Sequence, residues 1–255
     1  MFEKLDNFRD FGGCPAGDGQ VAPGRLFRSA HHAELSDRDV EVLHGLGVSL
    51  VVDLRQPSER RRQPSRRHAA FCGTVVETEI EIAAGDPWIG FLRTAPELSA
   101  EAFRDYIRRF YRAAPFEPGH VDVFSRYFAA LAQTDGAVLV HCMAGKDRTG
   151  ILVGLTHRLL GVPDEVIFRD YLSSNCPAAL PGRLAVLQAF VAEHAGREVA
   201  AECGRAALVA EAEFLALAFA EIERRHGSVE AYVEAVLGVG ADARSAIRGR
   251  LIVQA

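Results

Sequence analysis

The chain has 255 residues, of which 49% are hydrophobic and 25% are charged, and its formal net charge is −5. This composition is typical of a globular protein with a sizeable core, and it excludes a disordered chain, a collagen and a disulfide-stapled miniprotein. A net negative charge gives no reason to expect nucleic-acid binding, and no apolar run approaches the ~20 residues needed to cross a bilayer, so we expect no stable membrane insertion.

Strand and helix patterns alternate over the first 181 residues. Apolar and β-branched runs predict strands at 26–30, 49–54, 74–82 and 137–141. Capping serines, amphipathic spacing and terminal glycines predict helices at 36–46, 99–113, 120–133, 149–160 and 163–171. The alternation predicts an α/β fold with a central, mostly parallel sheet flanked by helices.

The last part of the chain carries only helical patterns, at 183–194, 207–226, 229–237 and 243–252. We therefore expect an α/β domain over 1–181, with a helical insert at about 83–133, and an all-helical C-terminal extension over 182–255. Phe214, Leu217, Ala218 and Ile222 mark an apolar face of this extension that we expect to pack on the α/β core.

The five cysteines are odd in number, widely spaced and without a Cys-x-x-Cys pair. This usage indicates a reducing compartment and neither a disulfide framework nor a zinc site. We expect a cytoplasmic protein without a signal peptide; export by a route that leaves no N-terminal signal is the open alternative. The sequence contains no pattern that predicts an oligomeric state.

The segment HCMAGKDRTG at 141–150 carries the most specific chemical signal, because it joins an apolar strand to a helix through a glycine-containing loop. Backbone N–H groups there should form a nest for a phosphate-sized anion, and the positive surroundings favour the thiolate of Cys142, a nucleophile for phosphoryl transfer. The fork of Arg148 can bind two phosphoryl oxygens. A buried, inert cysteine is the alternative. The predicted phosphate-binding residues are Met143, Ala144, Gly145, Lys146, Asp147, Arg148 and Thr149.

This segment resembles the signature loop of the cysteine-dependent protein tyrosine phosphatases, His-Cys-(five residues)-Arg-(Ser/Thr). Its inner part AGKDRTG is similar to a bacterial branch of tyrosine and dual-specificity phosphatases that includes secreted effectors of intracellular pathogens. Further blocks resemble that branch in the same order over most of positions 5–175. They are NFRDFGG at 7–13, RLFRSAHH at 25–32, VVDLRQPSER at 51–60 and DYLSSN at 170–175, and HGSVEAYV at 226–233 is similar too.

The resemblance implies a tyrosine-phosphatase-like fold and hydrolysis of phosphomonoesters through a phosphocysteine, with no metal and no cofactor. It implies that Cys142 carries the phosphoryl group, that Arg148 binds it, and that the Thr149 hydroxyl eases departure of the thiolate. His141 would support Cys142 without transferring a proton. The blocks with Asn7 and Arg28 are expected to tie the N-terminal segment to the sheet.

The general acid has two candidates, because the Trp-Pro-Asp loop of many relatives is absent and Asp86-Pro87-Trp88 reverses that order. Asp147 lies inside the loop, next to the path of the leaving group. Asp53 ends a predicted strand at the edge where such sites form. The alternatives are an electrostatic orienter of Arg148 for Asp147 and a turn-capping carboxylate for Asp53.

Lysine is rare in this chain, with Lys4 and Lys146 against 27 arginines. Lys146 therefore suggests a need for a compact ammonium, and the resemblance implies that a basic residue there meets a second phosphate of a phosphoinositide. We expect a phosphotyrosine protein or a phosphoinositide as substrate, with activity on phosphoserine and phosphothreonine as an extension. The alternative is that Lys146 only adds charge to the nest or pairs with a nearby carboxylate.

Other readings of the sequence differ in testable features. A rhodanese-like sulfurtransferase carries a loop cysteine but has no need of Arg148 followed by Thr149, and a catalytically dead phospho-ligand module would lose Cys142. A nucleotide P-loop is excluded, because Asp147 follows the lysine of GKDRT. The arginines between 60 and 67 could attract an anionic substrate, and the segment 83–119 could form a lid; a solvated face and a core helix are the plainer interpretations.

Overall fold

The structure is a computed structural model that describes residues 2–81 and 86–254. Its centre is a sheet of order β1-β4-β7-β5-β6. The strands are β1 (Arg9–Asp10), β4 (Leu26–Ser29), β7 (Ala137–His141), β5 (Val48–Asp53) and β6 (Thr74–Glu77). β4, β7, β5 and β6 run parallel, and β1 pairs antiparallel with β4. The predicted α/β fold with a mostly parallel sheet is confirmed.

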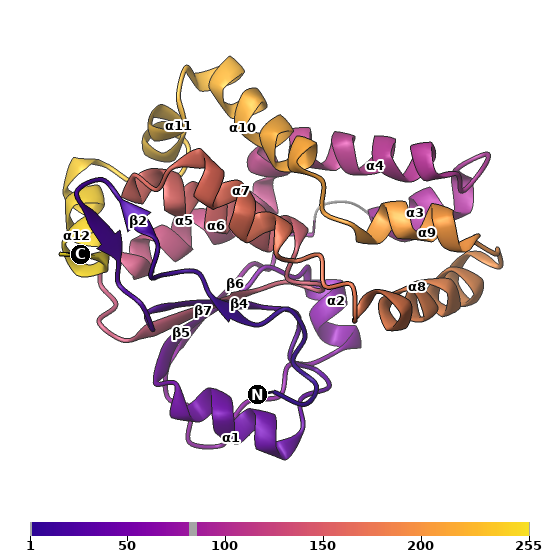
Figure 1. Ribbon diagram of the computed structural model, residues 1–255, viewed down its shortest axis with the longest axis horizontal. Helices are drawn as coiled ribbons and strands as arrows, with labels where there is room; N and C mark the ends of the chain where they lie inside the picture. Colours follow the sequence, from indigo (N-terminus) through magenta and orange to yellow (C-terminus); the bar gives the residue numbers. More distant parts are fainter. Residues whose placement is uncertain (1, 82–85, 255) are drawn as a thin grey trace.

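Helices cover both faces of this sheet (Figure 1). One face carries α1 (Asp37–Gly45), whose predicted cap Ser36 accepts from the backbone of Asp39. The opposite face carries α5 (Pro118–Leu131) and α6 (Asp147–Leu160), with α7 (Asp164–Leu172) against α6. All residues of β7 are buried, as expected for a central parallel strand covered on both sides. Short helical segments α2 (Pro57–Arg62) and η1 (Ala114–Phe116) complete this part.

The C-terminal extension contains α8 (Leu180–Ala195), α9 (Ala201–Leu208), α10 (Ala212–His226), α11 (Val229–Ala235) and α12 (Ala241–Leu251). Its predicted apolar face packs into the main core, where Phe214, Ala218 and Ile222 are buried. The sequence predicted one helix over 207–226, whereas the structure has two. They are separated because the Asn175 side chain hydrogen-bonds both the N–H and the carbonyl of Ala210.

The described chain ends in a strand that the helical pattern did not predict. β8 (Ile252–Gln254) pairs antiparallel with β3 (Gly19–Val21), which in turn pairs with β2 (Pro15–Ala16). The extension is therefore helical apart from β8, and this strand ties it to the N-terminal hairpin.

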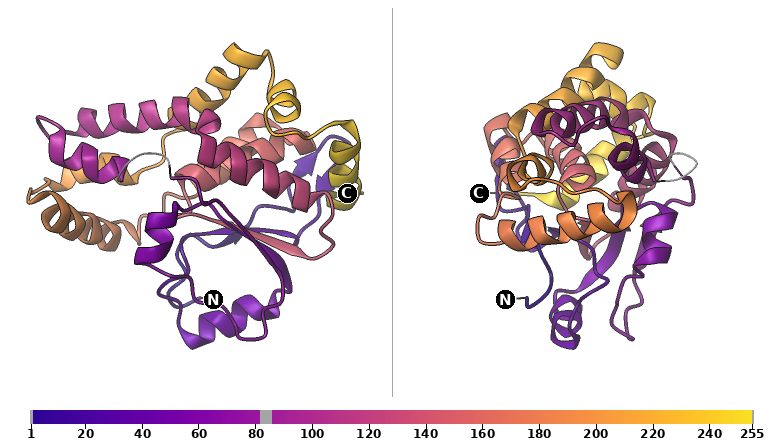
Figure 2. Two further views of the ribbon diagram at one scale, coloured as in Figure 1. Left: turned by 180° about the vertical axis from the view of Figure 1, so that it is seen from behind. Right: turned by 90° about the vertical axis from the view of Figure 1, so that its right-hand side faces the viewer.

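Four helices form what we call the side bundle, which extends away from the sheet (Figures 1 and 2). α3 (Pro87–Thr94) and α4 (Ala100–Ala113) come from the predicted insert, and α8 and α9 come from the extension. The bundle has an apolar core of its own, with Leu92, Phe103, Leu187 and Val191 buried in it.

Two predicted segments meet the limits of the described chain. The strand predicted over 74–82 ends at Glu77, and its last position, like the first residues of the insert at 83–85, lies outside the described residues. Over the described ranges, every helix is too short or too polar to cross a bilayer.

Candidate active site

The loop 142–146 lies where β7 ends and α6 begins, at the carboxyl edge of the parallel strands. β4 and β5 flank β7 on either side, so the segments that follow these strands border the loop. Cys142 stands at the base of the loop and is 2% exposed. The predicted nucleophile thus occupies the place where open α/β sheets bind their ligands.

Asn7 holds two carbonyl groups of the loop. Its side-chain amide donates to the carbonyl oxygens of Ala144 at 3.0 Å and of Gly145 at 2.9 Å. The Asn7 backbone has φ of 56°, in the left-handed region that asparagine tolerates better than most residues. The NFRDFGG block therefore reaches the back of the loop as well as the sheet.

Arg28 holds the same part of the loop from β4. Its guanidinium donates to the carbonyl of Gly145 at 2.9 Å and pairs with Asp170, which also pairs with Arg9 at 2.7 Å. Burial would raise the pKa of Asp170, but the two arginines lower it to about 2. Three of the sequence blocks therefore converge on one buried ion network beneath the loop.

Gly145 is required by the path of the loop. Its φ is 63°, and a Cβ there would lie 2.3 Å from the carbonyl oxygen of Ser29. At Gly150 the neighbour is different, since a Cβ would lie 2.8 Å from the ring of Tyr171. The two glycines thus allow close packing, Gly145 against Ser29 at the end of β4 and Gly150, inside α6, against the ring of Tyr171.

The donors of the loop stay free while its carbonyls are engaged. Within residues 2–81 and 86–254, no acceptor meets the backbone N–H groups from Met143 to Thr149. α6 begins at Asp147 and adds the positive end of its dipole. The Thr149 hydroxyl is buried and has no partner in the same described ranges. This set of free donors can bind a phosphate-sized anion.

The Arg148 side chain runs from the loop to α2. Its guanidinium donates to both carboxylate oxygens of Glu59, at 2.5 and 2.9 Å, and to the carbonyl of Leu54 at 3.2 Å. Burial alone would lower the pKa of Arg148, but Glu59 and the nearby Cys142 raise it above its usual range. Arg148 therefore stays charged, with its plane fixed beside the loop.

Glu59 is a site residue that we did not predict from the sequence. Its carboxylate also accepts from the backbone N–H of Gln56 at 2.7 Å, so the first turn of α2 fixes it in place. A signal was present, because Gln56, Pro57 and Glu59 have the spacing of a helix start and Glu59 interrupts a strongly basic run. What the sequence did not indicate was its partner, 89 positions further on.

Asp147 lies at the rim of the loop, and its side chain is 32% exposed. The Tyr111 hydroxyl in α4 donates to Asp147 Oδ1 at 2.9 Å, and the Lys146 ammonium lies 3.6 Å from the same oxygen. Asp147 Oδ2 accepts no hydrogen bond from the rest of the described chain. Asp147 therefore combines one anchored oxygen with one free oxygen.

Asp53 lies in a different environment. It is 0% exposed, and the Arg55 side chain donates to both of its oxygens, at 2.9 and 2.7 Å. Burial acts to raise the pKa of Asp53, but His141 and Arg55 hold it well below its usual range. The structure thus brings Asp53 next to His141 and gives it the contacts of an ionised positioning carboxylate, unlike those expected of a proton donor.

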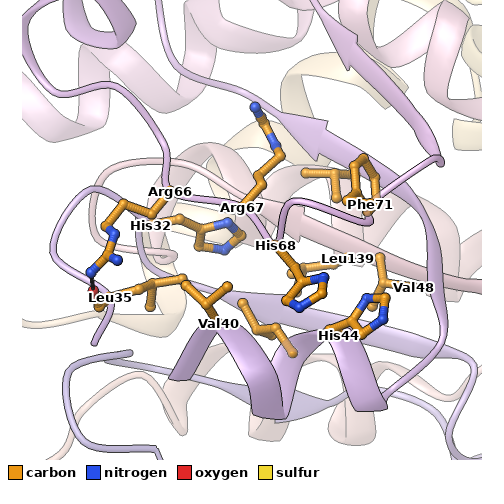
Figure 3. A pocket seen from close by; sticks show the side chains of 12 residues that line it. His32, Leu35, Val40, His44, Val48, Arg66, Arg67, His68, Phe71 and Leu139 are labelled. Carbon is orange, nitrogen blue, oxygen red and sulfur yellow. Dashed lines mark hydrogen bonds between the residues drawn. The ribbon is translucent and has the colours of Figure 1, made fainter. Parts of the chain in front are cut away.

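His141 is buried between Asp53 and His32. Its ring stacks on that of His32 with 4.0 Å between centroids, and burial lowers its pKa to about 4, so the ring is neutral at physiological pH. His32 also lines a hollow of about 40 Å³ between α1 and the segment 66–71 (Figure 3). A hollow of this volume has room for only about two or three water molecules, so it is not the substrate site.

Lys146 connects the loop to the side bundle. Its ammonium donates to the carbonyls of Ala207 at 3.0 Å and Leu208 at 3.2 Å, at the C-terminal end of α9. The residue is 4% exposed. Because cations stabilise the negative end of a helix, this contact holds α9 against the loop. To meet a second substrate phosphate, the ammonium would have to leave α9.

The basic run after Asp53 is compensated locally. Four of its arginines form ion pairs within 3.1 Å: Arg60 with Glu79, Arg61 with Glu81, Arg62 with Asp86 and Arg66 with Asp37. These pairs support the interpretation as a solvated face. In the described part of the chain, no three His, Cys, Asp or Glu side chains are grouped so that they could hold a metal ion.

A loop of free amide donors after a buried cysteine, at the carboxyl edge of a parallel sheet, suits a cysteine-dependent phosphatase. The comparison with known families agrees over nearly the whole chain. Residues 1–253 match the model of the tyrosine phosphatase family, and the chain belongs to that family. The predicted membership is confirmed, and the protein is a phosphatase hydrolase.

Individual relatives are similar over half or more of their length. A protein of Cupriavidus necator named as a tyrosine-protein phosphatase is 32% identical over 239 residues, which cover 93% of this chain and 84% of the relative. The triple specificity protein phosphatase PtpB of Mycobacterium tuberculosis is 29% identical over 253 residues, covering 89% and 90%. A tyrosine-protein phosphatase of Nostoc commune is 32% identical over 170 residues, covering 63% and 52%.

Proposed function

We propose that this chain hydrolyses phosphotyrosine in proteins through a phosphocysteine on Cys142. The observation that carries the proposal is the arrangement of the loop. Its carbonyls accept hydrogen bonds from other segments, its N–H groups have no acceptor in the described chain, and Glu59 fixes the plane of the Arg148 guanidinium. Such an arrangement is complementary to the three equatorial oxygens of a phosphoryl group in transfer. It supplies positive charge next to the sulfur without a metal or a cofactor.

The reaction has two steps. In the first, the Cys142 thiolate attacks phosphorus, the bond between phosphorus and the ester oxygen breaks, and an acid protonates the departing oxygen. In the second, water attacks phosphorus, the same carboxylate takes a proton from the water, and the sulfur–phosphorus bond breaks. Inorganic phosphate leaves and the thiolate is restored, with the Thr149 hydroxyl available to donate to it.

We assign the acid to Asp147 and a positioning role to Asp53. Asp147 is partly exposed at the rim and keeps one carboxylate oxygen free, which suits a group that must meet the leaving oxygen. Asp53 is ionised and committed to Arg55 beside His141. Its charge supports the orientation of the His141 ring next to the nucleophile.

The substrate range is proposed to extend to phosphoserine, phosphothreonine and phosphoinositides. The mycobacterial relative, which is similar along 89% of this chain, is named for triple specificity. Lys146 provides an ammonium next to the nest. This ammonium can leave the carbonyls of α9 and bind a second substrate phosphate instead. Lys146→Ala should then lower turnover of a multiply phosphorylated lipid more than turnover of a small aryl phosphate.

Rapid mixing with 4-nitrophenyl phosphate tests the phosphocysteine. We expect a burst of nitrophenol equal to the enzyme concentration wherever the second step is slower, and no burst or turnover in Cys142→Ser. Iodoacetate should inactivate the wild type at Cys142, with inorganic phosphate protecting it, while EDTA leaves the rate unchanged. Turnover by the purified serine variant would refute the scheme, and parallel assays on phosphotyrosine peptides, phosphoserine peptides and phosphoinositides define the range.

A further inference from the structure

Two buried tyrosines form a chain of hydrogen bonds that ends on Asp147. The Tyr111 hydroxyl donates to Asp147 Oδ1 at 2.9 Å, and the Tyr171 hydroxyl lies 2.7 Å from that of Tyr111. Tyr111 is 0% exposed and Tyr171 is 1% exposed. Buried hydroxyl groups in proteins are nearly always hydrogen-bonded. Here the last partner is the carboxyl to which we assign proton transfer.

The direction of the chain follows from counting protons. A phenol has one hydrogen to donate, and Tyr111 gives its hydrogen to Asp147. Tyr171 must therefore donate to the Tyr111 oxygen, and donors aligned in this way strengthen one another. Asp147 Oδ1 is thereby occupied as an acceptor, with the Lys146 ammonium 3.6 Å away as well. When Asp147 is protonated, its proton is therefore on Oδ2.

We propose that Tyr111, held by Tyr171, is a positioning residue that fixes the Asp147 carboxyl with its proton on Oδ2, toward the leaving oxygen. This inference rests on the proposed function, since it requires Asp147 to be the acid. The phenol also stabilises the carboxylate that remains after proton transfer, because it donates to the ionised form. Tyr111 belongs to α4, so the insert completes the active site.

The electrostatic surroundings of Asp147 define what a change at Tyr111 should do. The groups that face Asp147 are Lys146 and Arg148 from the loop and α6, Tyr106 and Tyr111 from α4, and Tyr171 from α7. Burial and Asp147 raise the pKa of Tyr111 well above its ordinary value, so the phenol keeps its proton over the working range of the enzyme. Its hydrogen bond is therefore present on both limbs of a pH profile.

Tyr111→Phe tests the proposal, with phenyl phosphate as the ester of a poor leaving group and 4-nitrophenyl phosphate as that of a good one. Loss of the phenol donor disfavours the carboxylate, so the alkaline limb of kcat on phenyl phosphate should move to higher pH by about one unit. Below that limb, kcat on phenyl phosphate should fall roughly tenfold more than kcat on 4-nitrophenyl phosphate, since only the poor leaving group needs an oriented acid. An unchanged pH profile with equal losses on both esters would overturn the proposal.

Tyr127→Phe is the matched control. Tyr127 is another fully buried tyrosine, and its hydroxyl bonds the Thr156 hydroxyl at 3.0 Å, a partner that belongs neither to the loop nor to Asp147. It should lose stability like Tyr111→Phe and keep both the wild-type pH profile and the ratio of the two esters. Tyr171→Phe keeps the hydrogen bond to Asp147 and should give a smaller shift in the same direction as Tyr111→Phe. A shift in Tyr127→Phe of the same size as in Tyr111→Phe would mean that the effect is structural.

The Asp147→Asn variant separates this inference from the proposed function. If Asp147→Asn shows no selective loss on phenyl phosphate, the assignment of the acid fails and the role of Tyr111 fails with it. If Asp147→Asn shows the selective loss and Tyr111→Phe does not, only the positioning role fails. In the double variant, Tyr111→Phe should cause no further selective loss, because it acts through Asp147; an additive loss would overturn the proposal.

Discussion

Arg148 is held as a planar fork, and the geometry of that fork matters more than its charge. Arg148→Lys keeps a cation but loses the paired contact with Glu59 and the second contact with phosphate. We expect kcat to fall by at least ~100-fold, which corresponds to about 3 kcal/mol of transition-state stabilisation. Steady-state kinetics on 4-nitrophenyl phosphate measures this. A loss of less than about threefold would show that a point charge is sufficient.

Glu59 should matter because it orients that fork. Glu59→Gln keeps the shape of the side chain and removes the charge that faces Arg148, so we expect kcat/KM to fall by about tenfold. Glu79→Gln is the control, since Glu79 is exposed and pairs with Arg60, away from the loop. Equal activity of the two variants would contradict a positioning role for Glu59.

Asn7 should control the affinity for anions. Asn7→Ala removes the donor to the carbonyls of Ala144 and Gly145, which frees this part of the loop to rotate its N–H groups away from phosphate. Competitive inhibition by inorganic phosphate should weaken by about tenfold, the equivalent of roughly one hydrogen bond. An inhibition constant equal to that of the wild type would show that Arg28 alone is enough to hold the loop.

At the scale of elements, the contact between Lys146 and α9 makes a prediction about motion. Without the ammonium on the carbonyls of Ala207 and Leu208, the end of α9 loses its charged cap. In Lys146→Ala, the backbone amides of α9 should exchange with deuterium about fivefold to tenfold faster than in the wild type. Lys4→Ala provides the control, because Lys4 is the other lysine of the chain. Equal exchange in all three proteins would mean that the side bundle is held by its apolar contacts.

The sequence predicted long elements better than short ones. The strands with buried, β-branched runs were found, as was α4, whose Ser99 cap and apolar spacing are both clear in the sequence. α2, α3 and α9, of six to eight residues, show less than three turns of periodicity and were missed, although α11, of seven residues, was predicted at 229–237. In α2 the pattern is further hidden by its arginines.

The sequence predicted the reactive loop and left its supports unidentified. Cys142 and Arg148 stand in one local pattern, whereas each supporting contact joins distant positions. In the sequence, Tyr111 was only one more apolar position of an amphipathic helix. Its hydrogen bond to Asp147 joins two residues that are 36 positions apart in the chain. Asp53 looked available at a strand end, but Arg55 donates to both of its oxygens and keeps it ionised. Contacts of this kind become visible only once the chain is folded.

At the scale of the whole molecule, buried histidines make stability depend on pH. Burial lowers the pKa of His120 and of His141 from the ordinary 6.5 to about 4. The unfolded chain takes up these protons as pH falls below 6.5, while the folded protein does not until about pH 4, so stability is lost within this window. Each ring should lower the free energy of unfolding by about 2 kcal/mol between pH 7.5 and pH 5.

Urea denaturation at these two pH values measures the effect. The acids with lowered pKa, such as Asp170, lose their stabilising contribution only at lower pH and do not interfere. In His120→Asn the difference between the two pH values should be smaller than in the wild type. Equal stability of the wild type at pH 7.5 and pH 5 would contradict neutral burial of these rings.

The bracing of the loop by distant segments has a consequence for the order of folding. Asn7 and Gly145 are 138 positions apart, and Arg9 and Asp170 are 161 positions apart. Contacts of such separation form late, since the chain must first pay the entropy of closing long loops. When Cys142 has just emerged from the ribosome, Asp170 has not yet emerged and cannot pair with Arg9 and Arg28. The newborn protein therefore exposes the cysteine that we propose as nucleophile before the loop proposed to bind phosphate is braced.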